Sequence, residues 1–365
     1  MKPSGLVTVA HLHEFEEIVD VRSPSEFAED HIPGAINCPV LSDAERVRVG
    51  TLHLQSPFEA KKIGAALIAR NIARHIETKW LDKPRTWHPL IYCWRGGQRS
   101  SAMTHILRQI GFAAERLDGG YKSYRHHVRE QLLALPAKLS YRVLCGLAGS
   151  GKSRLLKALQ QAGAQVLDLE EIARHRGSVL GDMPNEAQPS QKSFDSLLLA
   201  RLEAFDPALP VYVESESKKI GTLRIPDTLI HAMWSSPCIR LESPIAVRVA
   251  LLREDYAHFL LAPDLLAANL DRLQGMYANE LLAHWHSLCK AHAWDEFIAE
   301  LLEQHYDPAY NKSIRRNYAN YDQAYCLTLN SLNEQDFKRL AEEALALPGN
   351  FVNNGGHFQP PCRMR

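Results

Sequence analysis

Gly146-Leu147-Ala148-Gly149-Ser150-Gly151-Lys152-Ser153 fits the phosphate-loop pattern GxxxxGK[ST] at every specified position. Glycines let backbone N–H groups turn inward around a phosphate, a lysine adds positive charge, and the serine hydroxyl can hold Mg²⁺. A strand is expected before the loop over residues 140–145, and a helix after it over residues 154–159. The N-terminus of that helix would point at the anion. The pattern predicts a pyrophosphate or nucleotide site formed by Gly146, Gly149, Ser150, Gly151, Lys152 and Ser153.

Length and composition limit the class of protein. The 365 residues are 45% apolar and 23% charged, which is typical of globular proteins and predicts about two domains. Lysine plus arginine equals aspartate plus glutamate at 42 each, so any RNA site must be a local basic patch. The seven cysteines are scattered without a CxxC pair, which argues against a disulfide framework and a structural zinc site. With no recognisable signal peptide or membrane-length apolar run, we expect a soluble cytoplasmic protein.

A second strand-loop-helix stretch carries a cysteine. Residues 89–92 are expected to form a buried strand, followed by the loop Cys93-Trp94-Arg95-Gly96-Gly97-Gln98-Arg99-Ser100 and a helix over residues 101–107. A helix N-terminus and nearby cations stabilise a thiolate, and the loop amides can surround an oxyanion. We therefore predict that Cys93 is a nucleophile or sulfur carrier. The alternative is an unreactive core thiol, because most cysteines are buried.

Four phrases in the first 135 residues form an ordered set: Asp20-Val21-Arg22, the turn at residues 31–37, the loop from Cys93 to Arg99, and Leu117-Asp118-Gly119-Gly120-Tyr121. In this order they resemble a rhodanese domain. The resemblance implies that Cys93 carries a persulfide and that an anion is bound by Arg99 and the loop residues Trp94, Arg95, Gly96, Gly97 and Gln98. Asp20, Arg22 and His31 are expected to be structural, in a strand-end ion pair and a capped turn.

The remainder alternates strand and helix. Strands are expected over residues 165–169, 211–217, 239–242 and 325–329, which predicts a parallel sheet covered on both faces. The fold class is therefore α/β, with a rhodanese-like domain (residues 1–135) followed by a P-loop NTPase-like parallel-sheet domain (136–347) that has a helical region at about 263–305. Residues 348–365 are expected to be a disordered tail. Asp168 and Glu214 follow strands at the carboxyl edge and, with Ser153, predict a Mg²⁺ site.

Several basic residues are candidates for RNA contact. Residues 121–129 interleave aromatic side chains with Lys122, Arg125 and Arg129, which suits single-stranded RNA. A solvated helix face explains the same pattern equally well. Weaker candidates are Lys218, Lys219, Arg315 and Arg316.

Three phrases carry the resemblance further: Leu117 to Arg125 near the end of the first domain, and, in the second domain, Asp168-Leu169-Glu170 with His175-Arg176-Gly177-Ser178 and Val213 to Gly221. Together with the two loops they resemble the bacterial tRNA 2-selenouridine synthases. That resemblance implies exchange of sulfur for selenium on wobble 2-thiouridine of tRNA, with selenophosphate as donor and an S-geranyl intermediate made from geranyl diphosphate. It assigns the diphosphate and Mg²⁺ to the phosphate loop, selenium to Cys93 and the phosphate of selenophosphate to Arg99, with no tightly bound cofactor.

Two other functions fit the sequence. One is a sulfurtransferase coupled to an ATP-dependent domain, in which Cys93 carries a persulfide and Lys152 contacts ATP. The other is a non-catalytic RNA-binding regulator in which Cys93 is unreactive. The sequence leaves open which tRNAs are used, whether Cys93 forms a perselenide, whether one pocket serves both steps, and the oligomeric state.

Overall fold

The computed structural model describes residues 6–177, 181, 186–257, 266, 270–275 and 277–348. The chain divides into a first unit, Met1–Leu132 with Pro189–Ala200, and a second unit, Leu133–Gln188 with Arg201–Arg365. Residues 189–200 thus group with the first unit, although they come after the boundary that we predicted near residue 135. The predicted tail lies outside the described residues from position 349 onward, and the predicted helical region at 263–305 is described only in part.

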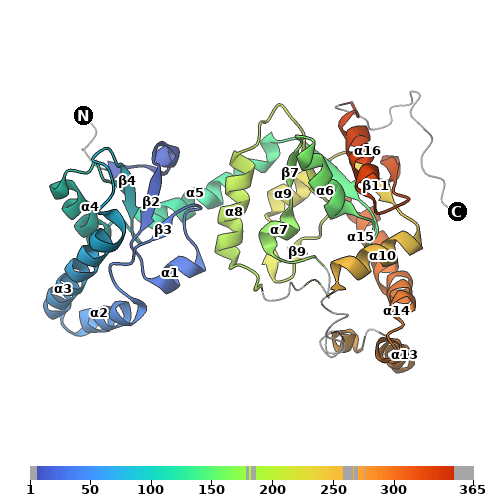
Figure 1. Ribbon diagram of the computed structural model, residues 1–365, viewed down its shortest axis with the longest axis horizontal. Helices are drawn as coiled ribbons and strands as arrows, with labels where there is room; N and C mark the ends of the chain where they lie inside the picture. Colours follow the sequence, from blue (N-terminus) through green and yellow to red (C-terminus); the bar gives the residue numbers. More distant parts are fainter. Residues whose placement is uncertain are drawn as a thin grey trace. The chain divides into compact units, whose positions relative to one another are not determined.

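The first unit contains a parallel five-stranded sheet in the order β1-β5-β4-β2-β3 (Figure 1). Its strands are β1 Leu6–Val7, β2 Glu17–Asp20, β3 Ile36–Asn37, β4 Pro89–Tyr92 and β5 Glu115–Leu117. Its helices are α1 Pro24–Glu29, α2 Asp43–Gln55, α3 Pro57–His75, α4 Gln98–Ile110 and α5 Gly120–Ala134. All four residues of β4 are buried, as expected for a central parallel strand.

The core of this unit lies between the sheet and helices α3 and α4. Val19 and Ile91 of the sheet pack with Ile72 of α3 and with Met103 and Leu107 of α4. Local signals fix the entry to α1, where Glu26 accepts a hydrogen bond from the N–H of Ser23 in a capping box.

The second unit contains a parallel five-stranded sheet in the order β12-β11-β6-β8-β7, which confirms the predicted fold class. Its strands are β6 Tyr141–Cys145, β7 Gln165–Leu167, β8 Val211–Glu214, β11 Cys238–Glu242 and β12 Tyr325–Thr328, with a separate antiparallel pair β9 Lys219–Ile220 and β10 Leu223–Arg224. Its helices are α6 Lys152–Gln161, α7 Leu169–Ala173, α9 Asp227–Ser235, α10 Ile245–Asp255, α13 Asn279–Lys290, α14 Trp294–Leu301, α15 Asp307–Asn317 and α16 Glu334–Leu345. Helix α8, Gln191–Glu203, begins in the segment that groups with the first unit.

Shorter helical turns complete the described chain. The 3₁₀ helices are Val9–Glu14, Pro136–Lys138, Asp271–Leu273 and Tyr321–Gln323. Two π-helical turns, Ile76–Trp80 and Leu302–Tyr306, continue α3 and α14. Among the residues that the structure describes, no helix has both the length and the apolar character needed to cross a membrane.

One face of the second sheet is covered by α6, α10 and α16. Leu144 and Leu241 of the sheet pack with Leu155 of α6, Leu251 of α10 and Leu340 of α16. A second core lies among α10, α13 and α14, around the fully buried Trp285. Because β6 is the middle strand, the loop that follows it emerges at the centre of the carboxyl edge, where open α/β sheets bind ligands.

Candidate functional site

The phosphate loop joins β6 to α6 and has the predicted strand-loop-helix context. Gly149 and Gly151 have φ angles of 72° and 95°, in the left-handed region that other residues rarely adopt. The Lys152 ammonium donates hydrogen bonds to the carbonyl oxygens of Gly146 (2.8 Å) and Leu147 (3.3 Å). The loop amides and the start of α6 therefore surround a position suited to an anion.

Two side chains that sequence reasoning did not assign to the site, the half-buried Tyr310 and the buried Arg248, support this loop. The Tyr310 hydroxyl accepts a hydrogen bond from the N–H of Gly146 at 2.8 Å and lies 2.7 Å from the Ser215 hydroxyl. Arg248 donates to the carbonyl oxygen of Ala148 at 2.9 Å and forms a 2.6 Å ion pair with Asp307. Tyr310 belongs to α15 and Arg248 to α10, and no local sequence motif indicates either residue.

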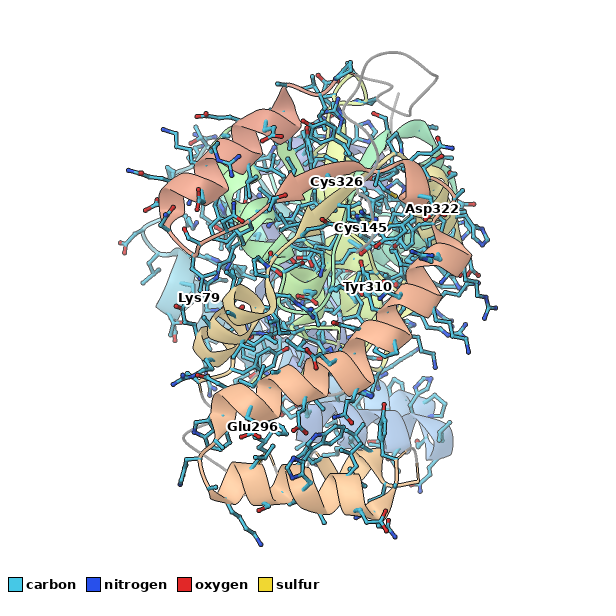
Figure 2. The ribbon with its side chains drawn as sticks, turned by 90° about the vertical axis from the view of Figure 1, so that its right-hand side faces the viewer. Lys79, Cys145, Glu296, Tyr310, Asp322 and Cys326 are labelled. Carbon is cyan, nitrogen blue, oxygen red and sulfur yellow. The ribbon has the colours of Figure 1, made fainter. Side chains whose placement is uncertain are left out.

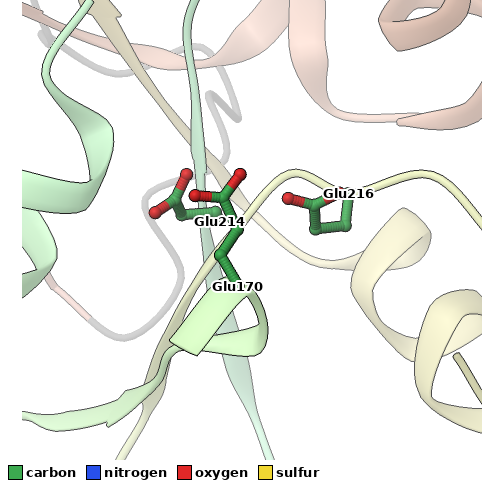
Figure 3. Close-up of side chains that lie close together, drawn as sticks. All are labelled: Glu170, Glu214 and Glu216. Atoms are coloured by element: carbon green, nitrogen blue, oxygen red, sulfur yellow. The ribbon is translucent and has the colours of Figure 1, made fainter. Parts of the chain in front are cut away.

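Three carboxylates meet beside the loop (Figure 3). Glu170 lies on α7, Glu214 ends β8 and Glu216 follows it, and one oxygen from each lies within 4.8 Å of the others. Burial, followed by the charge of Glu214, raises the pKa of Glu216 to about 8. Burial and the charges of Glu214 and Glu216 also raise the pKa of Glu170. The positive charge of Lys152 offsets part of the rise at each of the three glutamates, but all three pKa values remain raised. Without a cation, Glu216 therefore retains its proton near neutral pH.

The predicted metal set was Ser153, Asp168 and Glu214. Of these, Glu214 belongs to the three-carboxylate cluster, and the nearby Ser153 hydroxyl acts to lower the pKa of Glu214, which burial raises overall. Asp168 caps α7 by accepting the N–H of Glu171 at 2.8 Å. Spacing was the sequence signal that could have identified Glu216. Positions 214 and 216 are two residues apart just beyond the apolar part of the strand, so their side chains point to the same side of an extended segment. Among described residues, this cluster is the only group of three potential metal ligands, and neither histidine nor cysteine takes part.

The donors of the cluster fit a hard cation such as Mg²⁺, which prefers oxygen ligands. Glu214 is only 4% exposed, and its Oε1 has no hydrogen-bond partner. The hydroxyl of Ser150 in the phosphate loop is likewise buried without a partner. Buried polar atoms of this kind are costly unless a ligand, an ion or water satisfies them.

The phosphate loop and the acids line one cavity of about 1020 Å³. Its polar part includes Lys152, Ser153, Asp168 and the three-carboxylate cluster. Another part of its wall comes from α10, α14 and the π-helical turn after α14, and is formed by Leu251, Leu252, Phe297, Ile298, Leu301 and Leu302. The cavity can therefore receive a ligand with an anionic head and an apolar body.

The cysteine loop of the first unit connects β4 to α4. Cys93 is buried, with its Sγ 3.2 Å from the Ser100 hydroxyl and 3.9 Å from the carbonyl oxygen of Gly97. Gly97 immediately precedes α4, so the loop ends on a helix N-terminus as predicted. The start of α5 supports the loop, because the N–H groups of Tyr121 and Lys122 donate to the carbonyl oxygens of Cys93 and Trp94.

Arg99, the predicted anion contact, is engaged by an acid. Its Nη1 lies 2.6 Å from the carboxylate of Glu26. Burial would raise the pKa of Glu26, but the hydrogen bond and charge of Arg99 lower it overall. The other predicted loop residues, Trp94, Arg95, Gly96, Gly97 and Gln98, are exposed or partly exposed around the buried cysteine.

The basic residues proposed for RNA contact differ in their surroundings. Arg125 lies 3.0 Å from Asp195 and 3.4 Å from Asp30, so its charge is already compensated within the first unit. The side chains of the other six are exposed, and Lys218 lies 3.6 Å from Asp227; they are Lys122, Arg129, Lys218, Lys219, Arg315 and Arg316.

The residues expected to be structural make structural contacts. Asp20 and Arg22 form the expected buried ion pair at 2.6 Å. A ring nitrogen of His31 lies 2.9 Å from the carbonyl oxygen of Phe27, which ties the turn to α1.

Comparisons with known proteins identify both parts of the chain. The family model "tRNA 2-selenouridine synthase AAA domain" matches residues 139–288, and the rhodanese-like domain model matches residues 8–127. A tRNA 2-selenouridine synthase of Nitrosomonas europaea is 37% identical over 245 residues, which is 66% of this chain and 63% of that protein. The synthase of Bdellovibrio bacteriovorus is 31% identical over 343 residues (82% and 89%), and that of Marinobacter nauticus is 32% identical over 332 residues (81% and 88%). The chain therefore belongs to the tRNA 2-selenouridine synthase family.

Proposed function

We propose that this protein is a transferase that replaces sulfur by selenium in wobble 2-thiouridine of tRNA, in two steps. In the first, the phosphate loop holds the diphosphate of geranyl diphosphate while the thiocarbonyl sulfur attacks the carbon that carries it. The carbon–oxygen bond breaks and pyrophosphate leaves, its charge stabilised by Lys152 and the loop amides. In the second, the selenium of selenophosphate attacks C2 of the nucleoside, water cleaves the phosphorus–selenium bond and releases phosphate, and the C2–sulfur bond breaks so that geranylthiolate leaves and takes up a proton. Cys93 receives or positions the selenium, and Arg99 binds the phosphate.

The observation that carries this proposal is the cavity of about 1020 Å³, which combines a complete phosphate loop with an apolar wall. Burying hydrocarbon against such a wall is favourable by about 25 cal/mol per Å². The hydroxyl groups of a ribose lying there would lose hydrogen bonds to water without replacing them. An alkyl diphosphate therefore suits the cavity better than a nucleoside triphosphate does.

Mg²⁺ is the cation that we assign to this site. Ser153 and Glu214 would hold it, together with Glu170 or Glu216, because their oxygens converge beside the phosphate loop. When bound, the ion supplies positive charge that offsets the charge of the diphosphate. Asp168 would contribute indirectly by fixing the start of α7, which carries Glu170.

The test is nucleoside mass analysis of 2-thiouridine tRNA incubated with geranyl diphosphate and then with selenophosphate. We expect Lys152→Ala to slow prenylation by about 10²–10³-fold, since it removes one preorganised charge from the leaving group. We expect Cys93→Ala to accumulate the S-geranyl nucleoside. Cys38→Ala, which removes another buried thiol of the first unit, and Lys338→Ala, which removes an exposed lysine of α16, are the matched controls.

Other outcomes would favour the rival functions. If the wild type leaves the nucleoside unchanged unless ATP is added, the ATP-coupled sulfurtransferase becomes the better interpretation. If Cys93 proves inert to alkylating reagents and Cys93→Ala retains full turnover, neither a sulfur nor a selenium carrier role survives.

A further inference from the structure

One uninterrupted helical run lines the cavity. It consists of α14 (Trp294–Leu301), the π-helical turn Leu302–Tyr306 and α15 (Asp307–Asn317), and Figure 2 shows Glu296 and Tyr310 along it. Its cavity-lining side chains recur in adjacent pairs every four residues: 297/298, 301/302, 305/306, 309/310 and 313/314. This spacing keeps the pairs on one face, so a single side of the run follows the cavity from turn to turn.

Two contacts of Tyr310 fix the position of the phosphate loop along this face of the helical run. Tyr310 accepts the N–H of Gly146 at 2.8 Å, and its ring centroid lies 5.6 Å from the Lys152 ammonium. With an axial rise of about 1.5 Å per residue, Leu301 is roughly 14 Å and Phe297 roughly 20 Å back along the run from Tyr310. Distance along the run therefore measures distance from the phosphate loop.

The chemical character of the face changes along the same direction. The pair one turn from Tyr310 is His305 and Tyr306, which carry both ring surface and polar atoms. The next pairs, Leu301 with Leu302 and Phe297 with Ile298, are purely apolar. On this face, a ligand that begins at the phosphate loop therefore meets apolar side chains from the second turn onward.

Helix α10 adds apolar side chains to the same cavity, and the core packed against α14 supports the face. Leu252 of α10 lines the cavity and lies so close to the phosphate loop that a Cβ added at Gly149 would be 2.8 Å from its Cγ. Behind α14, Phe297 and Leu301 pack into the core that contains Trp285 and Leu288. This backing restricts movement of the apolar pairs, because well-packed cores yield little to added volume.

We infer that this face of the helical run sets the length of the hydrocarbon that the site accepts. An isoprene unit is comparable in length with one helical turn, about 5.4 Å, so each added unit requires one further pair of lining residues. In a geranyl chain the first unit passes His305 and Tyr306, the second contacts Leu301 and Leu302, and Phe297 with Ile298 limits further extension. This inference rests on the proposed function, since it assumes an alkyl diphosphate.

The test is calorimetric titration of the full-length protein, with Mg²⁺, by pyrophosphate and by dimethylallyl, geranyl and farnesyl diphosphates. For the wild type we expect geranyl diphosphate to bind most tightly. Leu301→Trp should weaken geranyl binding by about tenfold or more while leaving dimethylallyl and pyrophosphate binding within about twofold, because the added ring fills the space of the second unit. Phe297→Ala should shift the farnesyl-to-geranyl preference toward farnesyl by about tenfold.

Leu288→Ala is the matched control, because Leu288 belongs to the same core but does not line the cavity. It should lower Tm without altering the chain-length preference. Should Leu301→Trp or Phe297→Ala fail to fold, Leu301→Phe and Phe297→Leu test the same two turns with smaller changes in volume.

The outcomes separate the two proposals. If geranyl diphosphate binds more tightly than pyrophosphate but folded variants at 301 and 297 keep the wild-type preference, the length inference is wrong and the proposed function stands. If no alkyl diphosphate binds more tightly than pyrophosphate, both are overturned.

Discussion

The cysteine loop and the phosphate loop share one backbone plan but differ in what surrounds them. Each follows a fully buried parallel strand, β4 or β6, and ends on the N-terminus of a helix, α4 or α6. Each also uses glycine at positive φ, 65° at Gly96 and 72° at Gly149. The backbone alone would therefore make both loops suitable for an anion.

The neighbours supplied by distant segments make the loops different. At the cysteine loop, the nearest arginine of α4 is paired with Glu26, and the start of α5 holds the loop from behind. At the phosphate loop, three glutamates face the lysine, and α10 and α14 add an apolar wall. Two similar strand-loop-helix elements thus acquire different charges and different apolar surroundings from residues that belong to neither element.

The largest expected effect tests how the cysteine loop is supported. A Cβ added at Gly120, where φ is 59°, would overlap the carbonyl oxygen of Cys93 and lie 2.5 Å from the Gly96 nitrogen. Gly120→Ala should therefore displace the loop and slow selenium transfer by about 100-fold or more, since a displacement of about 1 Å can cost that much. The readout is selenation of S-geranyl tRNA. Gly111→Ala is the control, because Gly111 also has positive φ but has open space around it; an equal loss in both variants would contradict the support role.

The second effect concerns the carboxylates beside the phosphate loop. Because the folded-state pKa of Glu216 is raised from 4.5 to about 8, this group lowers stability progressively as pH rises from about 4.5 toward 8. In Mg²⁺-free buffer, Glu216→Gln should gain stability relative to wild type over that range, by a few kcal/mol at most, with the difference vanishing at acidic pH. Urea unfolding at several pH values measures it. A pH-independent difference would show that Glu216 is not protonated in the folded state.

A smaller effect tests whether Arg99 binds an anion. Removing the charge of Glu26 with Glu26→Gln frees Arg99 from its ion pair, so selenophosphate should bind about threefold more tightly, the value of one partly exposed charge pair. Arg99→Ala should weaken the same binding. Should neither variant change the affinity, Arg99 would serve only to hold α4 against α1.

The smallest effect concerns RNA. Charge reversal at exposed Lys122 or Arg129 should lower the salt dependence of tRNA binding by about one unit of slope per phosphate contact. Arg125→Gln should instead lower Tm without changing the slope, because that arginine already pairs with Asp30 and Asp195. An unchanged slope for Lys122 and Arg129 would favour the solvated helix face, and the same titration tests Lys218, Lys219, Arg315 and Arg316.

Local patterns predicted those features that consecutive residues determine. The apolar residues 89–92 form β4 at the predicted bounds, and the phosphate loop lies between a strand and a helix as expected. The helix α15 and the hairpin β9-β10 were not anticipated, although α15 supplies Tyr310 to the loop. The basic and aromatic sequence around Arg125 did not indicate that Asp30 and Asp195 lie beside it.

The sequence by itself determined the two loops, their order, the α/β class and the family, because each depends on motifs of a few consecutive residues. Only the tertiary structure decided which side chains converge on the phosphate loop. Gly146 and Tyr310 are 164 positions apart, and the three glutamates come from α7 and from the end of β8. Which face of a helix meets a cavity depends on how every element packs, and that information is spread over the whole chain.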